Sequence, residues 1–186
     1  QMFGETGDDR LEGGAGNDTL DGGSGNDFAL GGSGDDHIDL GEGDDDAKGE
    51  AGADYIGAGT GHDALDGGNG DDTLFGNEGN DTLAGGDGQD VVLGGADRIF
   101  GGRGNDRLAG GTDADRFIFD VNAYEHDVIE DFDSASDTIE WHGTHDLAIT
   151  QTTGGVEIRA LDGPSQTILL AGLNLAAFDQ DSLIFA

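Results

Sequence analysis

An aspartate recurs at every ninth residue over most of this chain. The series has thirteen members, with one step shortened to seven residues: Asp9, Asp18, Asp27, Asp36, Asp45, Asp54, Asp63, Asp72, Asp81, Asp90, Asp97, Asp106 and Asp115. A negative charge repeated so regularly has to be neutralised. The chain has only 7 Lys and Arg against 41 Asp and Glu. The sequence therefore predicts that cations are supplied from outside the protein.

An apolar residue follows each aspartate two positions later. These residues are Leu11, Leu20, Ala29, Ile38, Ala47, Ile56, Leu65, Leu74, Leu83, Val92, Ile99, Leu108 and Phe117. The net charge of -34 and the 38 glycines oppose folding and, taken alone, would favour disorder. A disordered chain has no reason to keep an aspartate and an apolar residue in fixed phase. The pattern indicates an ordered repeat.

The composition also limits the partners. There is no basic patch for nucleic acid or an anionic membrane surface, and no apolar run long enough to span a bilayer. The chain has no cysteine and no N-terminal signal of the secretory type. Gln1, Met2 and Phe3 read as the end of a preceding repeat, so we expect a piece of a longer protein. A monomer is expected, although the sequence leaves the oligomeric state open.

The nine-residue unit has the consensus G-G-x-G-x-D-x-U-x, where U is apolar. Its glycines permit a tight turn, and Asn or Asp at the fifth position is expected to tolerate a left-handed conformation. The last three residues suit a strand in which only the central side chain faces inward. We therefore expect six-residue turns joined by three-residue strands.

A fixed short period indicates a solenoid. Two repeats make one coil, so residues 18 apart stack about 4.8 Å from each other. The fold class predicted for residues 1–118 is all-β, a right-handed parallel β-roll. Its thirteen repeats would make about six and a half coils, roughly 30 Å long. One small inward side chain per repeat gives a thin core, which needs an added cross-link.

The expected cross-link is Ca²⁺. Stacked turns bring together carboxylates and backbone carbonyls without thiols, a donor set that suits Ca²⁺ better than Mg²⁺ or Zn²⁺. Pairing thirteen turns gives at most eleven sites, and we expect about ten ions. The ligands would be the aspartate series, with Asp97 weaker because its repeat at Gly94–Phe100 is short. Turn carbonyls would complete the sites, such as those of Gly13, Gly14, Ala15, Gly16, Gly22, Gly23, Ser24, Gly25, Gly31, Gly32, Ser33 and Gly34.

With these motifs, residues 2–118 resemble the RTX (repeats-in-toxin) family of secreted bacterial proteins. GGTDADRFIFD at Gly110–Asp120 and the following DVIEDF…DTIEW at Asp127–Trp141 are similar to the flank that follows such rolls in serralysin-type proteases and related exoproteins. The resemblance implies a parallel β-roll that binds Ca²⁺ through the aspartate series. It also implies an extracellular protein of a Gram-negative-type bacterium, exported unfolded by the type I secretion machinery and folded by external calcium.

Residues 119–186 leave the repeat and are expected to form a β-rich cap that covers the last coil and nucleates folding. Predicted strands are Asp127–Phe132, Thr138–Trp141, Leu147–Thr152, Val156–Ala160, Thr167–Ala171 and Ser182–Phe185. Asp127, Asp131 and Asp137 could hold a further Ca²⁺, or could be exposed strand and turn residues. The acidic-then-apolar end, Asp179–Ala186, could be a secretion signal or a plain terminal strand.

The chain carries no pattern typical of catalysis. His142 and His145 form H-x-x-H, whereas the zinc-protease pattern H-E-x-x-H is absent, so both read as surface histidines. The Gly-Gly-Ser-Gly stretches at 22–25 and 31–34 are turns of the repeat and not nucleophile motifs. There is also no glycine-rich phosphate loop with its lysine. We expect this chain itself to be no enzyme.

Three functions remain. The favoured one is a calcium-driven folding and secretion module attached to an enzyme or toxin. The second is a structural or adhesive β-roll, as in a surface layer or adhesin. The third is a polysaccharide-binding accessory module, which would need an exposed aromatic platform. The outward-facing candidates, Phe28, Tyr55, Phe75 and Phe100, are predicted to be too scattered to form one.

Overall fold

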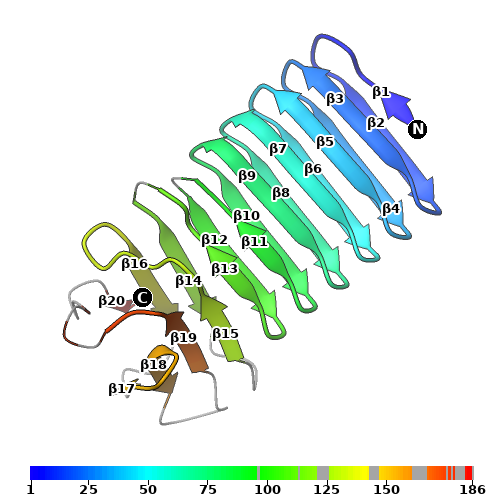
Figure 1. Cartoon of the computed structure of the whole chain (residues 1–186). Coiled ribbons are helices and arrows are strands. Elements are labelled where there is room, and N and C mark those ends of the chain that lie inside the picture. The colour runs from blue at the N-terminus through cyan, green and yellow to red at the C-terminus, as the bar shows by residue number, and fades with distance from the viewer. Residues whose placement is uncertain are drawn as a thin grey trace.

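The structure is a computed structural model, and every element in it is a β-strand (Figure 1). It describes residues 1–95, 97–112, 114–120, 126–142, 147–160, 167–174, 176, 178 and 183–185. Strands from alternate repeats stack into two long sheets that run side by side, as the parallel β-roll predicts. The described residues contain no helix that could cross a membrane.

The first sheet, sheet A, has eleven strands. In spatial order they are β1 (Met2–Phe3), β3 (Thr19–Ser24), β5 (His37–Glu42), β7 (Tyr55–Gly61), β9 (Thr73–Gly79), β11 (Val91–Leu93), β13 (Arg107–Ala109), β15 (His126–Ile129), β19 (Thr167–Ala171), β18 (Gly155–Ala160) and β17 (Leu147–Gln151).

The second sheet, sheet B, has nine strands. In spatial order they are β2 (Arg10–Ala15), β4 (Phe28–Ser33), β6 (Asp46–Ala51), β8 (Ala64–Asn69), β10 (Thr82–Asp87), β12 (Arg98–Arg103), β14 (Arg116–Asp120), β16 (Thr138–His142) and β20 (Leu183–Phe185).

The register confirms the predicted pairing of residues 18 apart. Leu20 pairs with Ile38, and Leu11 pairs with Ala29. The spacing falls to 16 where the shortened repeat intervenes, as between Leu83 and Ile99. Each repeat thus lies on its second neighbour in sequence.

The strands are longer than predicted. β3 has six residues, which leaves only residues 25–27 for the turn that follows it. The cause is that the glycine part of a repeat also pairs with the next coil, as Gly23 does with Gly41. Identical turns stack in register, so their backbone groups find partners there as well as in the strands.

All thirteen predicted inward residues are buried, with at most 3% of their surface exposed. Two further core residues are Leu40 and Ala58, each 0% exposed, which occupy the first position of their repeats in place of glycine. That position also faces inward, because it lies two residues beyond the apolar one. Leu40 and Ala58 therefore add buried side chains to the core at a position where the consensus residue is glycine.

Both sheets continue into the C-terminal segment. The strands predicted there are confirmed, with end points that differ by up to three residues. β17 and β18 form an antiparallel hairpin beside β19, whereas β20 adds a parallel strand to β16. Large aromatic residues fill this end of the core: Phe117, Phe119, Phe132, Trp141 and Phe178. Most of the proposed signal at 179–186 lies outside the described residues, as does His145.

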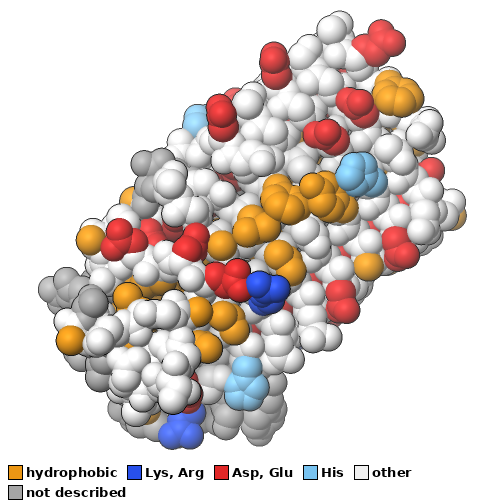
Figure 2. All heavy atoms as spheres, viewed as in Figure 1, with side chains coloured by type: hydrophobic (Ala, Val, Ile, Leu, Met, Phe, Trp, Pro, Cys, Tyr) orange, Lys and Arg blue, Asp and Glu red, His pale blue; other side chains and the backbone are white. Residues whose placement is uncertain are grey.

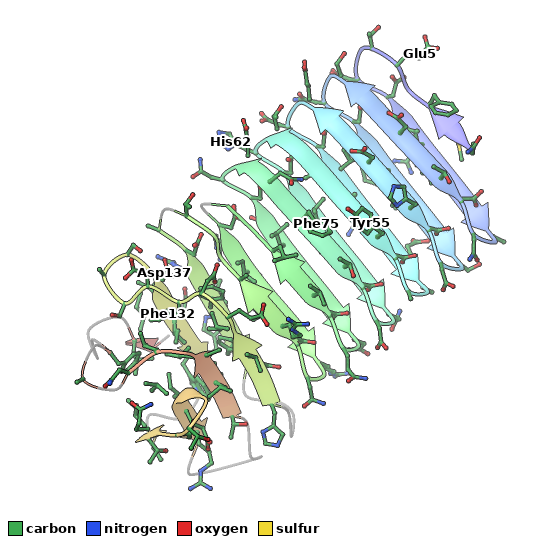
Figure 3. All side chains as sticks on the ribbon, in the orientation of Figure 1. Glu5, Tyr55, His62, Phe75, Phe132 and Asp137 are labelled. Carbon is green, nitrogen blue, oxygen red and sulfur yellow. The ribbon has the colours of Figure 1, made fainter. Side chains whose placement is uncertain are left out.

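The outer face of sheet A carries an aromatic stack that the sequence did not predict. His37 and Tyr55 stack with ring centroids 4.7 Å apart, and Phe75 lies 5.2 Å from Tyr55 (Figure 3). Figure 2 shows apolar side chains gathered along this face. The expectation that the aromatic residues are scattered is wrong for Tyr55 and Phe75. Phe75 pairs with Gly57, which has no side chain, so the Phe75 ring can reach the Tyr55 ring two residues along the neighbouring strand.

Leu74→Ala should lower the free energy of unfolding by about 2–5 kcal/mol, because it removes buried methyl groups and leaves a cavity. Leu74 is 0% exposed in the middle of the roll. Urea denaturation in saturating calcium would measure the change. The matched control is Thr73→Ala, whose side chain faces outward and whose loss should cost at most about 0.5 kcal/mol. Equal losses for the two variants would contradict the assigned register.

Candidate metal centre

The turns form two rows along the long edges of the roll. Edge 1 holds the turns that lead into sheet B, at 4–9, 22–27, 40–45, 58–63, 76–81, 94–97 and 110–115. Edge 2 holds the turns that lead into sheet A, at 13–18, 31–36, 49–54, 67–72, 85–90 and 101–106. Every aspartate of the series is the last residue of one turn, so each edge carries a column of aspartates.

One carboxylate oxygen of each aspartate joins neighbouring coils. The backbone N–H of Asp54 donates to Asp72 Oδ1 at 2.8 Å, and the same bond recurs along both edges. Thirteen such bonds run from Asp9 to Asp137, with lengths between 2.7 and 3.1 Å. The donor always belongs to the earlier coil. Oδ1 is therefore committed to stacking the turns.

The other carboxylate oxygen, Oδ2, is buried without a hydrogen-bond partner. Within the described part of the chain this holds for Asp9, Asp27, Asp36, Asp45, Asp54, Asp63, Asp72, Asp81, Asp90 and Asp106. The side chains from Asp27 to Asp106 are at most 3% exposed. A buried, unpaired carboxylate oxygen is costly unless a cation or a proton meets it.

Backbone carbonyls converge on the same places. A β-carbon added to Gly22 would lie 2.5 Å from Asp27 Oδ2 and 2.7 Å from the carbonyl oxygen of Leu40, in the next coil. Glycine is thus required because two oxygens occupy the space where a side chain would start. The next residue, Gly23, has φ of +100°, which only glycine adopts readily.

The fifth-position residues act differently from the prediction. None of Asn17, Asn26, Asp35, Asp44, Asp71, Asn80 or Asn105 has a positive φ. Six of these side chains, all but that of Asn80, instead accept a backbone N–H from the next coil, as Asn26 Oδ1 does from Asp44 at 3.0 Å. Asn and Asp are suited to this position because they carry a short acceptor. His62 fills the same role through Nδ1, which accepts from Asn80 N–H at 3.1 Å.

The short turn at 94–97 is altered as well as shortened. Asp97 Oδ2 accepts the N–H of Gly95 within its own turn. A cavity of about 470 Å³ opens beside it, lined by Asp81, Asp97, Arg98 and Arg116 among others. Asp97 keeps its place in the column through Oδ1, whereas its Oδ2 is bonded to its own turn, an arrangement consistent with the prediction that Asp97 is a weaker ligand.

The three C-terminal aspartates do not form a shared site. Asp127 accepts from Asp106 N–H on edge 2, whereas Asp137 accepts from Asp115 N–H on edge 1. Asp131 accepts from the N–H groups of Gly110 and Gly111. No cluster of three acidic, histidine or cysteine residues able to hold a metal occurs among the described residues. Asp127 and Asp137 are the last rungs of the two columns.

Burial raises the pKa of nine aspartates in the columns. Burial is the main cause, hydrogen bonds from the backbone oppose it, and neighbouring carboxylates add to it for most of the series. The pKa rises to about 6 for Asp63 and Asp72, and to about 7 for Asp90 and Asp97. It is also raised for Asp36, Asp45, Asp54, Asp81 and Asp106. The roll without metal therefore favours protons on these groups.

These residues fit Ca²⁺. The ion takes six to eight oxygen ligands in flexible geometry. Most pairs of stacked turns offer carboxylate oxygens without partners, and first-position carbonyls lie close to them, such as those of Gly22 and Gly31. The carbonyls of Ser24 and Ser33 already accept the N–H groups of Gly7 and Gly16, but each keeps a second lone pair.

The sequence profile of the RTX calcium-binding nonapeptide repeat matches residues 1–29, 21–56, 30–65, 57–92 and 93–120. The chain belongs to the RTX calcium-binding repeat family. A search of curated proteins finds no match.

Among solved structures, the RTX chain is similar to the extracellular lipase LipA from Serratia marcescens, with a TM-score of 0.50 and 19% identity. The match covers 90% of this chain but only 40% of the lipase. A second similar structure is the AlgE6R3 subunit of the Azotobacter vinelandii mannuronan C5-epimerase, with a TM-score of 0.36 and 26% identity, covering 67% of this chain and 78% of that one. The likeness to the lipase concerns the fold.

Without calcium, the RTX roll should gain stability as the pH falls from about 7 towards 4. Folding raises the pKa of these acids from an unfolded value near 3.8. Above the folded pKa the buried carboxylates are charged and destabilise the folded state. Below the unfolded pKa they are protonated in both states, so the destabilisation disappears. Circular dichroism in excess chelator should therefore show more β-structure at pH 5 than at pH 7.5. Calcium affinity should change in the opposite direction, because bound protons compete with the ion. Less β-structure at pH 5 would contradict the assignment.

Proposed function

We propose that this chain is a calcium-binding module that folds when it meets external Ca²⁺ and so supports the type I secretion and stability of a larger exoprotein. The observation that carries the proposal is the column of buried aspartate Oδ2 atoms without hydrogen-bond partners. A ligand set of this kind exists only while the turns are stacked. Calcium binding and folding are then one equilibrium.

Charge supports the same coupling. About ten Ca²⁺ ions would cancel about 20 of the 34 negative charges, at two per ion. At low calcium the carboxylates repel one another, and the thin core cannot hold the coils together. At high calcium each ion joins two coils. The aspartates are shared along an edge, so filling one site prepares the next and the transition is cooperative.

The setting that suits this mechanism is the outside of a Gram-negative-type bacterium. Family membership and the match to a lipase described as extracellular both fit an exported protein. The cytosol, with little free calcium, would keep the chain extended for type I export. Residues 119–186 would act as the cap that nucleates the roll. The end of the chain, 179–186, would serve as the secretion signal.

A calcium titration tests the proposal. In excess chelator at pH 7.5 the protein should give the circular dichroism of a disordered chain, and millimolar calcium should produce a cooperative change to β-structure. The hydrodynamic radius should fall in the same range of calcium. Magnesium at equal concentration is the control and should have little effect, because its small octahedral site suits this ligand set poorly. Full β-structure in chelator would overturn the proposal.

A further inference from the structure

The consensus of the repeat is kept on one edge of the roll and lost on the other. On edge 2, five of the six turns have glycine at the first, second and fourth positions; the exception is Glu50 at a second position. On edge 1, only the turn at 22–27 is complete. The departures are Glu5, Leu40, Ala58, Asn77, the shortened turn at 94–97 and Asp113. Successive turns along the chain lie on alternate edges, so the departures from the consensus look scattered in the linear sequence although nearly all of them lie on edge 1.

On edge 2 the oxygens converge at every step. A β-carbon at Gly67 would lie 2.5 Å from both Asp72 Oδ2 and the carbonyl oxygen of Gly85. At Gly13, Gly31, Gly49 and Gly85, too, the nearest atoms are an aspartate side chain and a carbonyl oxygen of the next coil. Five successive pairs of turns thus share one geometry.

Among the first-position glycines of edge 1, Gly4 and Gly22 show the same convergence of an aspartate oxygen and a carbonyl of the next coil, whereas Gly76, Gly94 and Gly110 do not. Leu40 and Ala58 then place real side chains, buried in the core, where the glycine turns bring oxygens within about 2.5–2.9 Å. A β-carbon cannot approach an oxygen so closely, so at these two turns the oxygens have to be displaced from the positions that they take beside glycine. Metal–oxygen distances tolerate only about 0.2 Å.

The C-terminal half of edge 1 departs further. At Gly76 the three nearest described atoms all belong to Asp81, so no carbonyl of the next coil lies within 3.4 Å. The next aspartate, Asp97, has its Oδ2 bonded to the N–H of Gly95. A cavity of about 470 Å³ lies beside this turn, although Asp81 and Asp97 are themselves at most 3% exposed. An ion here would keep more of its hydration and fewer protein ligands.

We propose that the two edges hold two classes of calcium site, a tight class of five on edge 2 and a weaker class on edge 1. This rests on the proposed function, since it concerns the same ions. The sites on edge 2 bind calcium first, and these ions hold the coils of the repeat region together along that edge. Edge 1 then fills over a higher range of calcium, on coils that are already stacked. The protein thus responds to calcium in two stages.

Counting bound ions by native mass spectrometry at increasing free calcium tests the two classes. A plateau near five ions should precede full loading, and calorimetry should resolve two phases. The decisive comparison is Asp72→Asn on edge 2 with Asp63→Asn on edge 1. The two aspartates are matched, since both are at most 3% exposed and the Oδ1 atom of each accepts the aspartate N–H of the preceding coil at 2.8 Å.

Asp72→Asn should weaken the tight class on the order of tenfold or more and lower the first plateau, whereas Asp63→Asn should change only the second phase. A gain of affinity gives a second test that does not depend on damaging the fold. Ala58→Gly should strengthen the weaker class, and Gly67→Ala should weaken the tight one.

The outcomes separate this inference from the function on which it rests. A single class of sites, with equal effects of Asp63→Asn and Asp72→Asn, would overturn the two classes and leave calcium-driven folding intact. A second phase that Ala58→Gly leaves unchanged would also overturn the two classes alone. Absence of calcium binding by the unaltered protein would overturn both.

Discussion

The structure depends on how each aspartate divides its two carboxylate oxygens. Oδ1 accepts a backbone N–H from the preceding coil, which fixes the spacing and register of the turns. In ten of the described aspartates Oδ2 is left buried without a hydrogen-bond partner, close to turn carbonyls. The first oxygen fixes the stacking of the turns, and the second is a desolvated charge that opposes folding unless a cation or a proton meets it. A chain with this division can be ordered by an ion and is disfavoured without one, because the desolvated charge opposes folding.

Much of the fold follows from periodicity alone. The pairing of residues 18 apart and the inward set from Leu11 to Phe117 are local consequences of the nine-residue unit, and the structure confirms both. The strands of the C-terminal segment were also predictable, since they are short apolar runs with clear boundaries. Strand length was not, because the extra pairing of residues such as Gly23 arises only between stacked coils.

Other features depend on contacts that a repeat count cannot show. Asp127 and Asp137 end the two columns, but they lie 21 and 22 residues after their partners and so fall outside the period. The acceptor role of the fifth position involves another coil, and local conformational preference gave the wrong explanation for it. The contact of Tyr55 with Phe75 joins two positions of the repeat that face the same side of one sheet. Each of these features depends on which coils lie next to one another in the roll.

The direction of the hydrogen bonds gives the C-terminal segment a special place. Every donor in the aspartate columns lies in an earlier coil and every acceptor in a later one, so each turn requires its C-terminal neighbour. The last acceptor on edge 1 is held independently of the roll, because Asp137 Oδ2 accepts the N–H of Asp133 four residues before it. Buried aromatic residues lie at this end of the core: the Phe132 ring, labelled in Figure 3, is 6.1 Å from that of Phe117 and 6.3 Å from that of Phe178. A locally fixed acceptor and an apolar surface are the properties that the proposed nucleating cap would need, because the coil next to it could then form before the rest of the roll.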